Sequence, residues 1–250
     1  MSVERALKLF KAVVRDGGSS SIAVIAKEQN VPLSTAQRWI AAFERQGLLV
    51  QSGQGRRTMG LELGELAGSD RSDQVLRAAA LPLLRRFARA NRTTVHLGRW
   101  DGEMVSYLAK ASSGPAIFTL EGMKLEGYCS AIGKVLLAHL GAGNLDDYLA
   151  GGPFIALTHR TIITCEQLRD ELAQVARQGF AIDDGEVQEG LLCCAVPVRD
   201  QANSARAALS MSVLHSGKQP AIPPMVEKLT GLRLALERRI FGTGADGDRP

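Results

Sequence analysis

A run of small polar and basic side chains within residues 31–47 is the clearest candidate for chemistry in this chain. Ala36, Ile40 and Phe43 fall at i, i+4 and i+7, so they share the inward face of a predicted helix. The outward side carries hydroxyl, amide and guanidinium groups, from Ser34, Arg38 and Arg45 opposite that face and from Thr35 and Gln37 on its flanks. Such groups bond to phosphate oxygens and to base edges in a DNA major groove. Taken alone, the pattern also fits an ordinary amphipathic surface helix.

The elements around this run favour the DNA interpretation. Pro32 suits the first turn of a helix, and Gly47 can end it in a left-handed conformation. Upstream, Ser21 is a plausible N-cap for a helix over residues 22–29. Asn30 then tolerates the left-handed backbone that a tight turn between helices requires. The sequence therefore predicts a helix-turn-helix, preceded by a helix over residues 3–15.

A predicted β-hairpin follows directly. Two short extended runs, residues 48–51 and 56–61, flank the glycine-rich loop 52–55. A hairpin after a recognition helix is a wing, and Arg56 and Arg57 at its tip are expected to contact phosphate or the minor groove. The alternative for two adjacent arginines is a solvated turn.

The charge distribution points the same way. The chain has 250 residues, 45% of them hydrophobic, which is enough for one large or two modest domains with a sizeable core. Residues 1–61 hold nine Lys/Arg and four Asp/Glu, whereas residues 62–250 hold 21 basic and 22 acidic groups. The basic character thus belongs to the N-terminal part, as a nucleic-acid-binding module requires.

The cysteines do not form a metal-ligand pattern. Cys129, Cys165, Cys193 and Cys194 include no Cys-x-x-Cys pair and no Cys/His spacing typical of zinc, so we expect no metal and no cofactor. No signal peptide and no run of about 18 apolar residues is visible, so no membrane association is expected. We expect a cytoplasmic protein with reduced thiols.

The vicinal pair Cys193-Cys194 suggests a second hypothesis, a thiol-dependent enzyme or hydrolase centred on Cys193. In an extended strand the two side chains point to opposite faces, so only one can reach a pocket. The four histidines (His96, His139, His159 and His215) lie in no recognisable nucleophile–base motif, and each fits a surface or core position better. These observations favour the DNA-binding hypothesis over the enzyme.

The C-terminal part reads as α+β with an antiparallel sheet. Helices are predicted over residues 75–90, kinked at Pro82, and over 130–140, 144–149, 164–178 and from Pro223 onwards. Thr164 to Gln167 form a capping box, and Gly179 closes that helix. Strands are predicted over residues 93–98, 104–109, 116–120, 180–183, 191–198 and 207–213. The tail from Gly242 is expected to be loose.

With these elements in place, the chain resembles the IclR family of bacterial transcriptional regulators. Four stretches carry the resemblance, namely Val31-Pro-Leu-Ser-Thr-Ala-Gln-Arg, residues 128–138, Gly179-Phe-Ala-Ile-Asp-Asp-Gly-Glu186, and residues 190–198. The resemblance implies a winged helix-turn-helix domain (residues 1–62), a linker (63–74) and a GAF-like α+β effector-binding domain (75–241). It also implies homodimers, often paired into tetramers.

The resemblance further implies a ligand site. In family members that bind small acids, the matching positions hold the ligand, and here they are Ala131, Ile132, Asp183, Leu191, Cys193, Ser210 and Ser212. The assignment is physically sensible, because N–H groups at a helix start attract anions and residues two apart on a strand point the same way. Asp183 can accept a bond from a ligand hydroxyl. A Ser-x-Ser pair and a cysteine beside Ala-Val-Pro are also common as purely structural features.

The expected function is a ligand-responsive transcriptional regulator, a repressor of a catabolic operon. It would bind double-stranded operator DNA as a homodimer or tetramer and be switched by a small organic or aromatic carboxylic acid.

Overall fold

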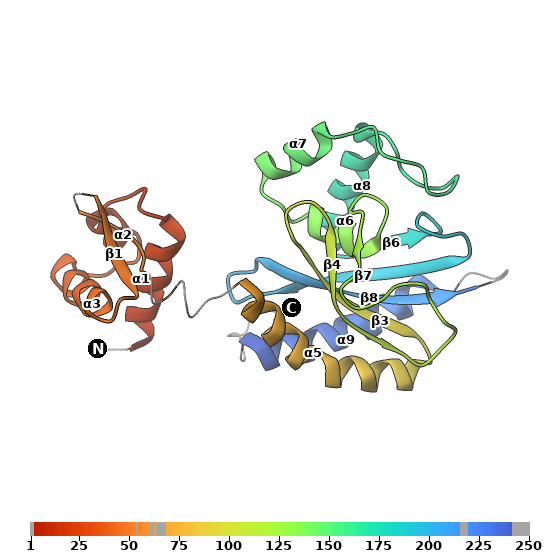
Figure 1. Cartoon of the computed structure of the whole chain (residues 1–250), viewed down its shortest axis with the longest axis horizontal. Helices are drawn as coiled ribbons and strands as arrows, with labels where there is room; N and C mark the ends of the chain where they lie inside the picture. The colour runs from red at the N-terminus through yellow and green to blue at the C-terminus, as the bar shows by residue number, and fades with distance from the viewer. Residues whose placement is uncertain (1–2, 54, 61–62, 64–68, 216–219, 242–250) are drawn as a thin grey trace. The chain divides into compact units, whose positions relative to one another are not determined.

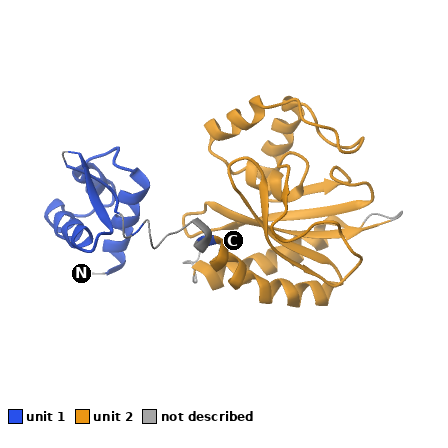
Figure 2. Cartoon of the chain, in the orientation of Figure 1, with its two compact units in different colours: residues 1–72 blue, residues 73–250 orange. Residues whose placement is uncertain are grey.

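The computed structural model describes residues 3–53, 55–60, 63, 69–215 and 220–241. The chain divides into two compact units, residues 1–72 and residues 73–250 (Figures 1 and 2). The division falls within the stretch 63–74 that was expected to be a linker. Each unit is described by itself below.

Unit 1 is a small helical bundle with a two-stranded sheet. Its elements in chain order are α1 (Val3–Asp16), α2 (Ile22–Glu28), α3 (Leu33–Arg45), β1 (Leu49–Gly53) and β2 (Arg56–Met59). The strands pair antiparallel as the predicted wing, with Leu49 opposite Met59. All three helices and β1 contribute to one core, which contains Leu9, Val13, Ile25, Ala36, Ile40 and Leu49. The helix-turn-helix with a wing is therefore confirmed.

Local signals in unit 1 act as the sequence predicts. The Ser21 hydroxyl accepts the N–H of Val24 and caps α2. Asn30 has a positive φ of 51° in the turn between α2 and α3. These two residues set the path between the helices, and so they fix which side of α3 faces the core.

Unit 2 contains a six-stranded antiparallel sheet in the order β5-β4-β3-β8-β7-β6. The strands are β3 (Thr94–Trp100), β4 (Val105–Ser112), β5 (Lys124–Leu125), β6 (Ala181–Asp184), β7 (Leu191–Arg199) and β8 (Ala205–Leu214). The long helices α5 (Ser69–Asn91) and α9 (Ile222–Phe241) cover one face, as Figure 1 shows. The other face carries α6 (Ala131–Leu137) with α8 (Cys165–Gln178) beside it, and α7 (Ala142–Ala150) packs against α8. This is the predicted α+β architecture.

Helix boundaries in unit 2 follow their caps. Ser130 accepts the N–H of Gly133 (3.1 Å) to begin α6, and Thr164 accepts the N–H of Gln167 (3.3 Å) to begin α8. Gly179 closes α8 with a φ of 78°. Gly133 is required by packing, because a Cβ there would lie 2.2 Å from the carbonyl oxygen of Gly127. The start of α6 is therefore held tightly against the preceding turn.

One predicted element was wrong. Residues 116–120 form no strand, and the edge strand is instead Lys124–Leu125. The predicted strand fails because its polar groups bond to side chains: the Lys110 ammonium binds the carbonyls of Ile117 and Thr119 instead of a neighbouring strand. The helix predicted over residues 75–90 corresponds to α5, which begins earlier, at Ser69. The predicted loose tail from Gly242 lies outside the described residues.

Candidate functional sites

The exposed face of α3 carries the polar residues that the periodicity assigned to it. Ala36 and Ile40 are buried, and Phe43 packs partly buried against Phe10. Ser34, Gln37, Arg38 and Arg45 are exposed, and Thr35 is half-buried. The helix therefore offers hydroxyl, amide and guanidinium groups together on its solvent side, the chemistry that base edges and phosphates accept.

The two wing arginines differ in their contacts. Arg56 is exposed, whereas Arg57 donates from Nε to the Glu44 carboxylate at 2.5 Å. Arg57 also donates from Nη1 to the carbonyl of Arg56. Because Glu44 belongs to α3, this ion pair ties the wing to the helix. The sequence pattern alone does not distinguish the contacts of Arg56 from those of Arg57.

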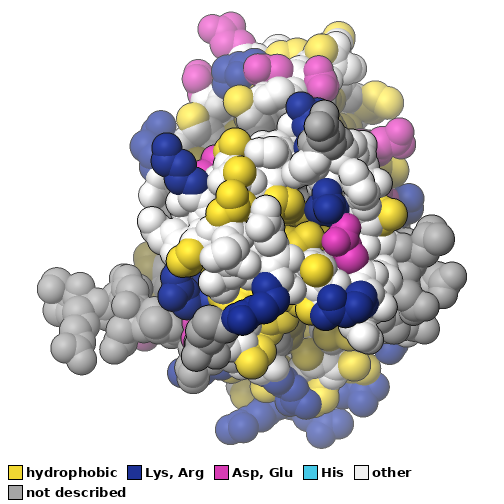
Figure 3. Space-filling model, turned by 90° about the vertical axis from the view of Figure 1, so that its left-hand side faces the viewer, with side chains coloured by type: hydrophobic (Ala, Val, Ile, Leu, Met, Phe, Trp, Pro, Cys, Tyr) yellow, Lys and Arg dark blue, Asp and Glu magenta, His cyan; other side chains and the backbone are white. Residues whose placement is uncertain are grey.

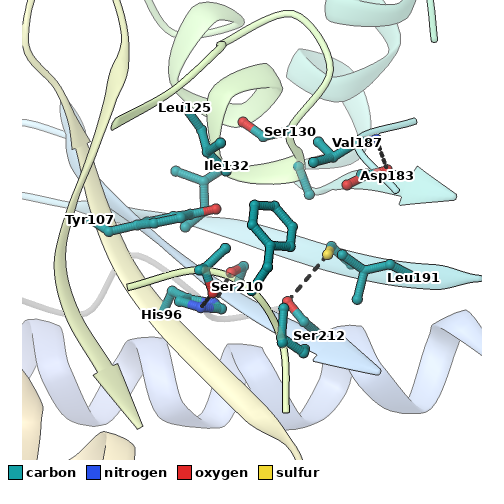
Figure 4. A pocket seen from close by; sticks show the side chains of 15 residues that line it. His96, Tyr107, Leu125, Ser130, Ile132, Asp183, Val187, Leu191, Ser210 and Ser212 are labelled. Carbon is teal, nitrogen blue, oxygen red and sulfur yellow. Dashed lines mark hydrogen bonds between the residues drawn. The ribbon is translucent and has the colours of Figure 1, made fainter. Parts of the chain in front are cut away.

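Unit 2 contains a pocket on the α6 side of its sheet (Figure 4). All seven residues that the sequence assigned to ligand binding line it, and they come from α6, β6, β7 and β8. The remaining lining residues are His96, Tyr107, Ile117, Phe118, Thr119, Leu125, Ser130 and Val187. Residues more than 100 positions apart in the chain are thus brought together at one place.

The floor of the pocket is a row of hydrogen-bonded polar groups on neighbouring strands. Ser212 lies opposite Cys193 in the β7–β8 register and accepts the thiol proton at 3.2 Å. Ser210 lies opposite His96 in the β3–β8 register, with its hydroxyl 3.4 Å from Nδ1. The other ring nitrogen of His96 is 2.7 Å from the hydroxyl of Thr119. The two serines do point to the same side of β8, as their spacing predicts.

Asp183 is held beside this row by the turn that follows β6. Its Oδ1 accepts the N–H groups of Glu186 (2.7 Å) and Val187 (3.4 Å). Burial raises the pKa of Asp183 to about 6, although these backbone bonds oppose the rise. The carboxyl therefore changes its charge close to neutral pH inside the pocket.

A buried ion pair supports the same turn. The ammonium of Lys134, on α6, binds the carboxylate of Glu186 and the carbonyl of Ile182. Glu171 on α8 also reaches this ammonium, at 3.2 Å. Burial raises the pKa of Glu186 to about 7 despite the nearby positive charge. Lys134 thus links α6, β6 and α8 at a position adjoining Asp183.

The aromatic side of the pocket was not predicted from the sequence. His96 stacks on Tyr107 with ring centroids 4.8 Å apart, and both rings are buried. Burial, assisted by the charge of Lys110, lowers the pKa of His96 to about 3, so its imidazole is neutral. A histidine in the middle of an apolar strand was the available signal. That histidine alone could not be assigned to the pocket, because the pairing of β3 with β8 cannot be predicted from either strand's sequence.

The two vicinal cysteines point to opposite faces, as predicted. Cys193 lines the pocket, whereas Cys194 lies in the core beneath α5 and α9. Burial, with the nearby Asp183 charge, raises the pKa of Cys193 well above its usual value, so the group is a thiol and not a nucleophilic thiolate. The thiol donates to the Ser212 hydroxyl, and the adjacent Asp183 carboxyl raises the pKa of Cys193 both by its charge and by hydrogen bonding, which disfavours the thiolate.

Within the described ranges, no group of three or more metal-binding side chains is placed to hold an ion. In the same ranges, no helix is long and apolar enough to cross a bilayer.

Comparison with known families decides between the two hypotheses. The model of the bacterial transcriptional regulator IclR C-terminal domain matches residues 71–219, and that of the IclR helix-turn-helix domain matches residues 2–53. This chain belongs to the IclR family. It is a DNA-binding transcriptional regulator with a C-terminal ligand domain, and its family is not one of enzymes.

Individual relatives of this IclR-family regulator agree along its length. It is 31% identical over 243 residues to the HTH-type transcriptional regulator XynR of Escherichia coli, with 96% of each chain covered. It is 28% identical to the transcriptional repressor IclR of the same species, covering 84% of this chain and 79% of that one. An IclR homolog from Microbacterium hydrocarbonoxydans, solved in complex with 4-hydroxybenzoate, superimposes with a TM-score of 0.64 at 25% identity, covering 96% and 98% of the two chains.

Proposed function

We propose that this regulator represses a catabolic operon and is switched by a small carboxylic acid bound in the pocket of unit 2. Operator DNA would be bound by the exposed face of α3 and by the wing, through Ser34, Thr35, Gln37, Arg38, Arg45, Arg56 and Arg57. The observation that carries the effector proposal is the convergence of all seven expected ligand residues on one pocket. The complex of a related protein with 4-hydroxybenzoate supports an aromatic acid as one class of effector.

The lining suggests how a carboxylate is recognised. No Lys or Arg lines the pocket among the described residues, so recognition would depend on dipoles and hydroxyl groups. The N–H groups of Ala131 and Ile132, in the first turn of α6, have no acceptor among the described residues and can take the carboxylate together with Ser210 and Ser212. The stacked His96 and Tyr107 form an apolar wall that suits a flat ring.

Asp183 would select the group at the other end of the ligand. Two facing carboxylates repel each other, so Asp183 favours a hydroxyl, carbonyl or hydrated carbonyl over a second acid group. A hydroxyl donates directly to the ionised Asp183. A ligand carbonyl accepts a hydrogen bond from Asp183 when the carboxyl is protonated.

Ligand entry would require the pocket to open. The cavity holds about 10 Å³, roughly the space of one water molecule. The segment carrying Phe118, itself 45% exposed, is held by the bonds of Lys110 and by the bond between Thr119 and His96. An effector that displaces this segment would stabilise one arrangement of unit 2 over another. A ligand acts as a switch only if its affinity differs between two such arrangements.

The effector proposal is tested with the Ser210→Ala/Ser212→Ala/Asp183→Ala variant. Calorimetry with 4-hydroxybenzoate and other small aromatic acids should show binding to the wild type and none to the variant. Mobility shifts on the DNA upstream of the protein's own gene should show that both bind the operator, but only the wild type responds to the acid. A matched control, Ser113→Ala/Ser204→Ala/Asp170→Ala, changes exposed residues outside the pocket. Undiminished acid binding in the pocket variant would place the effector site elsewhere.

The assembly proposed with this function is a homodimer, or a tetramer of two dimers. The outer side of α1 exposes Val3 (75%) and Leu7 (47%), apolar groups that a second copy would cover. A dimer would present two α3 helices to half-sites about 34 Å apart or a multiple of that. Sedimentation showing a monomer at micromolar concentration, both free and on DNA, would refute the dimer.

A further inference from the structure

The charge of unit 2 is concentrated in one layer. Residues 74–92, which cover most of α5 and the first residue after it, and residues 222–241 of α9 hold nine Lys/Arg and two Asp/Glu. The rest of residues 73–250 holds eleven Lys/Arg and seventeen Asp/Glu. A unit that is nearly neutral as a whole therefore has a basic helical layer, visible as the Lys and Arg side chains along the bottom of Figure 3.

Three residues in the second half of α5 and one directly after it form the centre of this layer. Arg85, Arg86, Arg89 and Arg92 are all exposed, and we call them the α5 arginine face. Arg85 and Arg89 lie one helical turn apart on α5, and Arg92 follows the end of the helix in a left-handed backbone conformation with a φ of 50°. Leu84 and Ala88, on the opposite side of the helix, are buried against the sheet.

Other arginines in or beside this layer have carboxylate partners. Arg77 pairs with Glu121 at 2.7 Å, Arg99 with Asp73 at 2.8 Å and Arg233 with Glu237 at 3.1 Å. Among the described residues, no ion pair involves a member of the α5 arginine face, and no Asp or Glu occurs in the sequence between residues 74 and 100. Arg85 adds only a minor charge interaction with Glu121, which already binds Arg77.

This arrangement has a cost for the helix itself. Like charges three or four residues apart on one helix face repel each other and destabilise the helix. The negative end of the helix dipole compensates cations at the helix end, which accounts for Arg89 in the last turn and Arg92 directly after it. It does not account for Arg85 and Arg86, which lie further from the end. A set of charges that is unfavourable in the free protein points to an anionic partner.

We propose that the α5 arginine face binds the phosphate backbone of duplex DNA, as a second contact surface beside the helix-turn-helix. Eight of the nine basic residues in the layer are arginine, whose planar guanidinium matches a phosphate in a bidentate manner. DNA is already bound to the same chain through unit 1, so a second site of low intrinsic affinity acts at high effective concentration. The contact would add affinity without base specificity, because it involves phosphates alone.

The test compares two full-length variants with the same loss of charge. The first is Arg85→Gln/Arg86→Gln/Arg89→Gln/Arg92→Gln. The matched control, Arg160→Gln/Arg169→Gln/Arg177→Gln/Arg206→Gln, removes four exposed arginines of unit 2 that lie outside the basic layer. Fluorescence anisotropy with a labelled duplex of unrelated sequence, about 40 base pairs long, measures the dissociation constant from about 50 to 200 mM NaCl.

The expected result is a flatter salt dependence in the first variant only. Each lost phosphate contact lowers the slope of log K against log salt by about 0.9, so the loss of two to four contacts lowers it by roughly 1.8 to 3.6. Circular dichroism should show that the variant melts at or above the wild-type temperature, since helix repulsion is removed. An unchanged slope, or an equal change in both variants, overturns the proposal. Neither result bears on the effector pocket, because no acid is present.

Discussion

The exposed face of α3 and the pocket of unit 2 are built in opposite ways. The α3 residues belong to one helix, face solvent and include Gln37 and Arg38 one position apart. The pocket residues come from several strands, a helix and a loop, are mostly buried, and bond to one another. On α3 a side chain can be changed without disturbing the core, whereas in the pocket a change also alters packing and hydrogen bonds.

This difference has consequences for binding and for stability. An exposed residue contributes to DNA affinity through its own contact, so its removal should leave the folded state intact. A buried polar residue such as Asp183 or Ser210 would, under the proposed function, contribute to ligand affinity, to stability and to the pKa of its neighbours together. The predictions below test this contrast, from the largest expected effect to the smallest.

The Gln37→Ala/Arg38→Ala variant should show the largest effect. Loss of one base contact and one phosphate contact is expected to weaken operator binding by about 100-fold, at about 1–3 kcal/mol per good contact. Because both side chains are exposed, the free energy of unfolding should change by no more than about 0.5 kcal/mol per substitution. The control, Lys27→Ala/Gln29→Ala, changes exposed residues in the last turn and at the C-cap of α2 and should keep its affinity. Equal affinities for both variants would mean that α3 is not the recognition helix.

Effector binding should depend on pH in a way that DNA binding by α3 does not. Asp183 has its pKa raised to about 6, so it is neutral below that value and charged above it. A ligand whose carbonyl approaches Asp183 should lose affinity as the pH rises through 6, by up to about tenfold per pH unit, because only the protonated carboxyl donates to a carbonyl. His96 does not contribute, since it is neutral throughout this range.

Calorimetry with 4-hydroxybenzoate and with a keto acid between pH 5 and 8 would measure this dependence. Asp183→Asn should flatten the profile, whereas Glu186→Gln tests whether the neighbouring carboxyl, with its pKa raised to about 7, is the cause instead. The folded state also holds the Asp183 proton more tightly than the unfolded state, whose pKa is near 3.8. The free energy of unfolding should therefore decrease as the pH rises from 4 to 6. A wild-type keto-acid affinity that is independent of pH would exclude Asp183 from the site.

The smallest effects are expected in the wing, where an exposed residue and an internally paired one stand side by side. Arg56→Ala should reduce the salt slope of DNA binding by about 0.9 if it contacts one phosphate. Arg57→Ala should reduce it less and should lower stability by up to about 1 kcal/mol, since its partner Glu44 is partly exposed. Glu44→Ala would release Arg57 and should tighten DNA binding a few-fold. Equal slopes for the two arginine variants would show that the ion pair opens on DNA.

The sequence by itself determined the features that depend on near neighbours. The faces of α3, the cap at Ser21, the left-handed Asn30 and the end of α8 at Gly179 each follow from a few consecutive residues, because helical periodicity and capping are local. The opposite orientations of Cys193 and Cys194 follow from strand alternation in the same way. The seven pocket residues were available only through the family resemblance, since their separation along the chain gives no local signal.

The tertiary structure decided what depends on strand order and burial. His96 meets Ser210 only because β3 pairs with β8, an adjacency across 114 positions that neither strand encodes alone. Thr119 belongs to a segment with strand-like composition, yet it bonds to His96, and the Lys110 ammonium takes the carbonyls that a strand would have used. The shifted pKa of Asp183 and the pairing of Arg57 with Glu44 arise in the same way. Desolvation and long-range contacts exist only once the elements have packed together.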